Sequence, residues 1–149
     1  MLKTKYILCN IVTIITLVGA MAFYGNTHKG KMKGTNTMKI RIGKSIFTAK
    51  LYDNPAAKAF TNLLPITVGL TELNGNEKYV DLPTKLPVDS HKPCMIKDGD
   101  IMLYGSATLV LFYKSFTTPY SYTRLGKVDD TSGLEDALGS GNVEITFEH

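Results

Sequence analysis

The feature that most constrains this chain is a pair of apolar segments within residues 99–116, separated by Gly105 and Ser106. Both segments are rich in β-branched and aromatic residues, and a glycine-containing break between two such segments is typical of a β-hairpin. Apolar residues fill consecutive positions, so both faces of this hairpin are expected to be buried. We therefore expect one face to lie in a core and a helix to cover the other.

The rest of the ordered sequence is predicted to form mostly β-strands. Asn74 and Gly75 are the strongest hairpin-turn pair in the chain, and β-forming segments lie on both sides of them. Segments with strand-like alternation or continuous apolar character occur at 39–43, 45–52, 66–73, 78–82, 120–125 and 142–148.

Two short helices are expected between these strands. Asn54 suits the cap before a helix, and Pro55 suits its first position, where a backbone N–H has no partner to lose. Residues 132–135 have the spacing of a capping box, and Gly139 is suited to end the helix that follows. About eight strands and two short helices in residues 38–149 predict a mainly β protein, a closed β-barrel with the helices as caps.

The N-terminal sequence has the pattern of an export signal. Lys3 and Lys5 precede an uncharged apolar segment at 6–18, and small residues follow up to Ala22. Residues 1–22 are therefore predicted to be a signal peptide or an uncleaved N-terminal anchor, because the apolar stretch is near the lower length limit for spanning a membrane. Either alternative places the protein outside the cytoplasm or on the membrane.

A linker and one domain are expected after this segment. Residues 23–37 lack periodicity and are rich in Gly, Asn, Thr and Lys, so they are predicted to be a flexible linker. The barrel domain is predicted to span 38–149. A start of translation at Met38 is a further alternative, and it would leave the protein in the cytoplasm.

The distribution of charge argues against a polyanionic partner. The formal net charge is +4, but the excess of basic residues precedes Met38, and the net charge from there onward is −1. We therefore expect no nucleic-acid binding, and membrane contact only through the N-terminal segment. The spacing of His, Cys and acidic residues fits no metal site, so no metal or cofactor is expected. Cys94 is expected to be a small packed residue beside Pro93.

Several of these segments are similar in sequence to a known protein family. The similar segments are 54–60, 63–65, 99–104, 109–113 and 120–126. With them the domain resembles the bacterial cyclophilin-like fold proteins, small barrels that are related in fold to cyclophilins but lack their sequence signatures. The resemblance implies the barrel fold over nearly the whole ordered chain. It implies no particular activity, because this family is largely uncharacterised.

True cyclophilins are prolyl isomerases that place an arginine beside a phenylalanine-lined proline pocket, with glutamine, tryptophan and histidine around it. Here residues 66–72 contain no arginine, and the chain contains no glutamine and no tryptophan. The isomerase residues therefore do not carry over, and only Arg124 is available as a substitute. We expect a barrel that binds a peptide or small ligand without efficient catalysis. The alternative is a prolyl isomerase with a non-standard site.

Aromatic residues indicate where a ligand would bind. Tyr104, Tyr113, Tyr120 and Tyr122 lie on neighbouring predicted strands and, with Phe112, are expected to form the wall of a groove. The alternative explanation is that tyrosine favours half-buried sheet positions without any ligand.

Two charged residues complete the expected binding surface. Arg124 is two positions beyond Tyr122 on the same predicted strand face, where it would contact an anion or carboxylate. Its alternative role is a surface ion pair with Asp129 or Glu144. Glu72 continues an apolar strand face, so it is expected either at the barrel rim in water or inside a pocket with a raised pKa.

Overall fold

The computed structural model describes residues 36–149. The predicted signal peptide or anchor at 1–22 lies outside the described residues, as does nearly all of the predicted linker. Thr37, the last residue of that linker, belongs to the first strand, in which it pairs with Lys50. Among the residues that the structure describes, no helix is long and apolar enough to cross a membrane.

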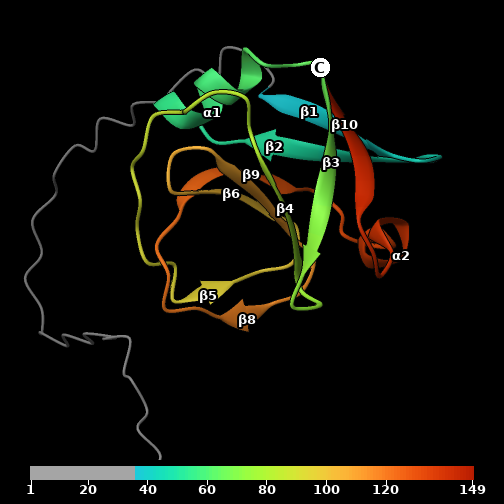
Figure 1. The fold of residues 1–149 in the computed structure, drawn as a ribbon. Helices are drawn as coiled ribbons and strands as arrows, with labels where there is room; N and C mark the ends of the chain where they lie inside the picture. The colour runs from blue at the N-terminus through green and yellow to red at the C-terminus, as the bar shows by residue number, and fades with distance from the viewer. Residues whose placement is uncertain (1–35) are drawn as a thin grey trace, which may run out of the picture. The chain divides into compact units, whose positions relative to one another are not determined.

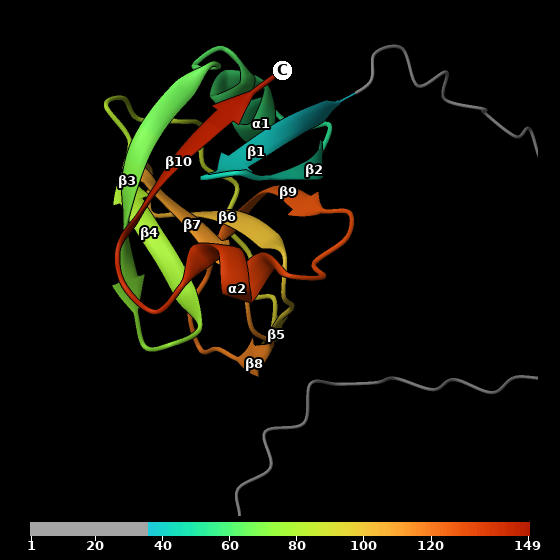
Figure 2. The same cartoon turned by 90° about the vertical axis from the view of Figure 1, so that its right-hand side faces the viewer.

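Eight antiparallel strands close into a barrel, as expected (Figure 1). The order around the barrel is β1, β10, β3, β4, β7, β6, β9, β2. The strands are β1 (Thr37–Ile42), β2 (Ser45–Leu51), β3 (Ile66–Leu73), β4 (Glu77–Asp81), β6 (Asp100–Tyr104), β7 (Thr108–Phe112), β9 (Thr123–Val128) and β10 (Val143–Glu148). Two short strands, β5 (Met95–Ile96) and β8 (Phe116–Thr117), form a separate sheet. Figures 1 and 2 show this sheet at the opposite side of the domain from α1 (Pro55–Thr61).

Helix α1 begins as the sequence predicts. The Asn54 side chain accepts a hydrogen bond from the Ala57 N–H at 2.8 Å, and Pro55 occupies the first turn. The start of α2 (Leu134–Leu138) differs from the prediction, because no side chain caps it. Gly133 stands at the cap position with a φ of 76°, so the expected capping box does not form. Gly139 ends α2 as predicted.

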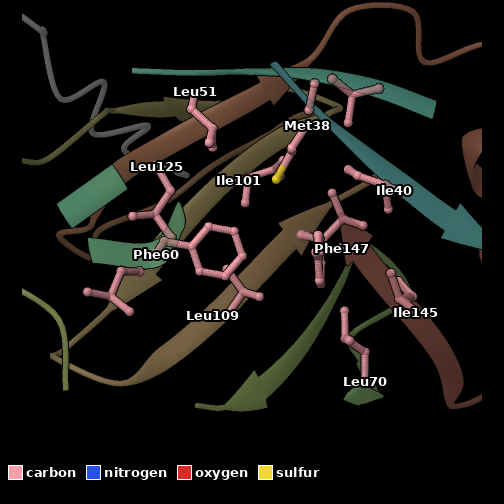
Figure 3. Packing of buried hydrophobic residues seen from close by; sticks show 14 of the residues in the cluster. Met38, Ile40, Leu51, Phe60, Leu70, Ile101, Leu109, Leu125, Ile145 and Phe147 are labelled. Carbon is pink, nitrogen blue, oxygen red and sulfur yellow. The ribbon is translucent and has the colours of Figure 1, made fainter. Parts of the chain in front are cut away.

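The main core fills the interior of the barrel. Inward-facing side chains of the strands pack there with Phe60 of α1 (Figure 3), and Leu134 of α2 belongs to the same cluster. The rings of Phe60 and Phe147 meet edge to face, with 5.7 Å between their centroids. The two helices therefore close the barrel by inserting apolar side chains into the same core.

The outer face of the β6–β7 hairpin is also buried, but not by a helix as expected. Met102 and Val110 alternate with the core residues of their strands and belong to a second apolar cluster. Ile96 of β5 and Phe116 of β8 cover them together with Tyr122. Strands of two residues carry no periodicity of their own, so the sequence could not reveal this cover.

Candidate functional site

A groove of about 650 Å³ opens on the outer face of the barrel beside this second cluster. Residues of β4 and β7 and residues within 116–122 contribute to its lining. A volume of this size is ordinary for a small-molecule site. We call it the tyrosine groove; its lining residues include Glu77, Tyr79, Asp81, Tyr104, Val110, Phe116, Tyr120 and Tyr122.

Five aromatic rings form a continuous row along the tyrosine groove. Centroid distances between neighbours in the row are 5.5–6.0 Å, and the interplanar angles range from tilted to edge-to-face. These geometries are favourable for aromatic pairs. The row runs in the order Phe116, Phe112, Tyr122, Tyr104 and Tyr120.

The structure thus brings together four of the residues singled out from the sequence. Phe112 is fully buried, so it belongs to the row but does not line the groove as expected, while Tyr122 is 5% exposed and does line it. Burial raises the pKa of Tyr122 above its ordinary value, so its hydroxyl stays protonated at neutral pH. Tyr104 and Tyr120 are about half exposed, with 48% and 57% of their surface open to solvent. These two rings offer apolar area that no described part of the chain covers.

Arg124 does not join the tyrosine groove. The predicted strand from residue 120 begins only at Thr123, so Tyr120 and Tyr122 lie on an irregular segment to which strand alternation does not apply. Arg124 instead lines a separate hollow with Asp89 and His91, which we call the polar hollow because most of its lining residues are charged or polar. The alternative ion pair with Asp129 or Glu144 is also absent among residues 36–149. Asp129 pairs instead with Lys50 at 3.3 Å.

Glu72 also lies outside the tyrosine groove, in a network at the end of the barrel. The Lys78 Nζ lies 2.6 Å from a Glu72 carboxylate oxygen, and the Tyr113 hydroxyl donates to the same carboxylate at 2.9 Å. The Gly75 N–H adds a third hydrogen bond at 2.8 Å. Burial raises the pKa of Glu72, but these donors and the Lys78 charge outweigh it and hold the pKa below its ordinary value. A raised pKa, one of the two expectations for Glu72, is therefore wrong.

The prediction that Tyr113 joins the groove tyrosines is wrong, because its hydroxyl turns to Glu72, and sequence reasoning missed the role of Lys78 in this network. Lys78 is entirely buried, and its ammonium also donates to the carbonyl oxygens of Gly139 and Gly141 at 2.9 and 2.6 Å. All three ammonium hydrogens thus have acceptors. Burial and the hydrogen bond to Glu72 raise the pKa of Tyr113 to about 12. Such a satisfied network is structural in character, and Lys78 joins β4 to the turn after α2.

Sequence reasoning also missed Glu77, which lines the tyrosine groove. Glu77 is only 9% exposed, yet its carboxylate forms no hydrogen bond or ion pair with any residue in the described range 36–149. Burial and the nearby charge of Glu72 raise the pKa of Glu77 above its ordinary value. The neighbouring Asn76 Oδ1 is likewise buried, and it finds no hydrogen-bond partner within that range. Among the described residues, Asn76 Oδ1 is the fully buried side-chain acceptor without a partner, whereas the Glu77 carboxylate keeps some surface open to the groove.

Three further observations bear on the expected site chemistry. Cys94 is exposed rather than packed beside Pro93. Within the described part of the chain, no three His, Cys, Asp or Glu side chains come close enough to hold a metal ion. Asp89 and His91 lie 3.1 Å apart, and both side chains are more than three-quarters exposed.

The raised pKa of Glu77 leads to a prediction about stability. The folded protein keeps the Glu77 proton to a higher pH than the unfolded chain does, so stability is lost as pH rises from 4.5 through the folded pKa. We expect Glu77→Gln to raise the thermal unfolding midpoint at pH 7 and to lose this advantage near pH 4. Glu144→Gln, at an exposed position of β10, is the matched control. An equal midpoint for wild type and Glu77→Gln at pH 7 would contradict this assignment.

These features define a class of protein: a small closed antiparallel barrel, capped by two short helices, with an aromatic groove on its outer face. The model of the Cyclophilin-like family matches residues 40–148, and the chain therefore belongs to that family. This confirms the resemblance and the barrel fold expected from the sequence.

The chain is similar in fold to the solution structure of a hypothetical protein from Archaeoglobus fulgidus. The TM-score is 0.52 at 17% sequence identity, and the alignment covers 79% of this chain and 98% of that one. None of the curated proteins compared with this chain matches it. At this identity the likeness to the Archaeoglobus fulgidus protein concerns the fold alone and indicates no function.

Proposed function

We propose that this protein is a binding module that takes a peptide segment or a small ligand into the tyrosine groove without catalysing a reaction on it. The observation that carries the proposal is the aromatic row with its two half-exposed rings, Tyr104 and Tyr120, beside a groove of about 650 Å³. Large aromatic side chains supply contact area with little conformational entropy to lose, which favours ligand binding.

Prolyl isomerisation finds less support from the geometry. That reaction needs a donor placed at the amide nitrogen of an X–Pro bond in an apolar, proline-sized pocket. Arg124 lines the hollow with Asp89 and His91, whose other lining residues include Asp53 and Asn54 but none of the five rings of the aromatic row. A binding role therefore explains the groove with fewer assumptions.

We further propose that the module works outside the cytoplasm, either released or held by its N-terminal segment. This part of the proposal rests on the sequence alone, namely the basic start, the apolar segment at 6–18 and the small residues up to Ala22.

A neutral aromatic probe tests the binding role. We expect the full chain to bind N-phenyl-1-naphthylamine with enhanced fluorescence, and Tyr104→Ala to weaken the binding by about threefold to tenfold, because one ring of the row is lost. Tyr52→Ala is the matched control, since Tyr52 is partly exposed but lines the separate polar hollow. Undiminished binding by Tyr104→Ala, or loss of binding by Tyr52→Ala, would contradict the assignment of the groove.

A further inference from the structure

The charges of the tyrosine groove are all of one sign. Its lining includes two carboxylates, Glu77 and Asp81, and no Lys, Arg or His from the described residues 36–149. Asp81 accepts a hydrogen bond from the Thr108 hydroxyl at 2.6 Å, so its charge is partly satisfied. Lys78, the residue next to Glu77, does not neutralise these carboxylates. Its side chain lies on the opposite face of β4 and pairs with Glu72.

Glu77 differs from the other buried acid in the described part of the chain. Asp100 is equally buried, but it accepts hydrogen bonds from the Lys97 N–H at 2.9 Å and the Lys127 ammonium at 3.2 Å. Glu77 has neither kind of donor within residues 36–149. The Glu77 carboxylate is thus largely buried, borders the groove and has no donor from the described chain, so it can accept a hydrogen bond from a ligand. The buried Asn76 Oδ1 beside it has no donor either.

The arrangement of charge and rings is complementary to a cation with an apolar body. The Glu77 carboxylate in the groove lining is an acceptor for an N–H donor, and a largely desolvated carboxylate binds a charged donor most strongly. The faces of tyrosine rings attract a cation as well. The half-exposed rings of Tyr104 and Tyr120 offer surface for an apolar or aromatic stem.

We propose that the tyrosine groove selects ligands that carry an ammonium or guanidinium group on an apolar stem, with the Glu77 carboxylate as the acceptor of that group. This inference rests on the proposed function, because it assumes that the groove is a ligand site. A free amine and a lysine or arginine side chain of a peptide share this chemistry. An organic cation fits better than a metal ion, since most of the groove wall is aromatic or apolar.

Calorimetry on the full chain separates these sources and tests the proposal. The first arm compares tyramine with 4-propylphenol, which replaces the ammonium by a methyl group. The second compares a blocked lysine tripeptide with the same peptide containing norleucine. We expect the cation of at least one pair to bind about tenfold or more tightly than its neutral analogue, and Glu77→Gln to remove that difference. Glu144→Gln should leave it unchanged.

The outcomes distinguish this proposal from the binding role beneath it. Equal affinities for the cation and its neutral analogue, unchanged in Glu77→Gln, would overturn the selectivity for cations. If the neutral aromatic probe still depends on Tyr104 in that case, the binding role stands. If neither cations, neutral analogues nor the aromatic probe bind, both proposals fail. The thermal unfolding midpoint of Glu77→Gln, measured on the same sample, distinguishes a loss of binding from a loss of folding.

Discussion

Replacing Glu72 by methionine is expected to lower the free energy of unfolding by about 3 kcal/mol, because it leaves a buried positive charge without its counter-ion. The Lys78 side chain is completely inaccessible to solvent, and its ammonium lies 2.6 Å from the Glu72 carboxylate. Two carbonyl oxygens remain as acceptors in the variant, but they carry no full charge. Chemical denaturation at neutral pH measures the loss directly.

The double variant Glu72→Met/Lys78→Met is the decisive control for this prediction. Removing both charges removes the desolvation cost as well, so the double variant should recover most of the stability lost in the single one. Because the pKa of Glu72 is lowered in the folded protein, the wild type should keep the contribution above pH 4.5 and lose it as pH falls through the folded pKa. A Glu72→Met variant as stable as wild type, or a double variant with the summed loss, would contradict the account.

Phe60→Ala is expected to lower the free energy of unfolding by about 3–5 kcal/mol, the usual cost of removing a fully buried aromatic side chain. Phe60 has no exposed surface and meets the Phe147 ring in the barrel core (Figure 3). It is also the largest contribution of α1 to that core, so its loss should loosen the helix from the barrel.

Thermal and urea unfolding, followed by far-ultraviolet circular dichroism, would measure the effect of Phe60→Ala. Ile46→Ala is the control, because this apolar side chain is 52% exposed and its truncation should change stability by at most about 0.5 kcal/mol. Similar losses in the two variants would show that α1 does not close the barrel through Phe60.

Local sequence patterns predicted much of the fold because each reports a nearby physical requirement. The break at Gly105 marks the turn of the β6–β7 hairpin, and Asn54 caps α1 through its own side chain. The alternation at 142–148 placed Ile145 and Phe147 in the core. In each case a short segment and its immediate neighbours determine the structure.

The errors arise where the structure depends on distant contacts. Val110 is covered by residues of β5 and β8, which are separate two-residue strands. Strands this short show no hydrophobic periodicity, so the sequence pattern did not predict them. The position of Arg124 depends on where β9 begins, and backbone bonds between His91 and Tyr122 fix the irregular segment before it. The capping box at residues 132–135 failed because a glycine took the cap position.

The candidate site was only partly visible in the sequence for a similar reason. Aromatic residues on adjacent strands are evident from composition, and Tyr104 and Tyr122 do meet. Glu77 and Lys78 could not be distinguished, because charged residues are ordinarily exposed and neither breaks a strand pattern. The two side chains differ in environment because neighbouring residues of β4 face opposite sides of the strand. Lys78 therefore faces Glu72, and Glu77 faces the groove. The sequence does show two adjacent residues of opposite charge, Glu77 and Lys78, directly after the Asn74–Gly75 turn. On a strand such neighbours must face opposite sides.

The most direct test of the central claim is to map a bound ligand by backbone amide chemical shifts of the full chain during titration with tyramine. The account predicts shifts that concentrate on residues 76–81, on Tyr104 and on residues 116–122, the segments that form the tyrosine groove. Saturable shifts concentrated instead around Arg124 and His91 would show that the polar hollow is the binding site and would contradict the account.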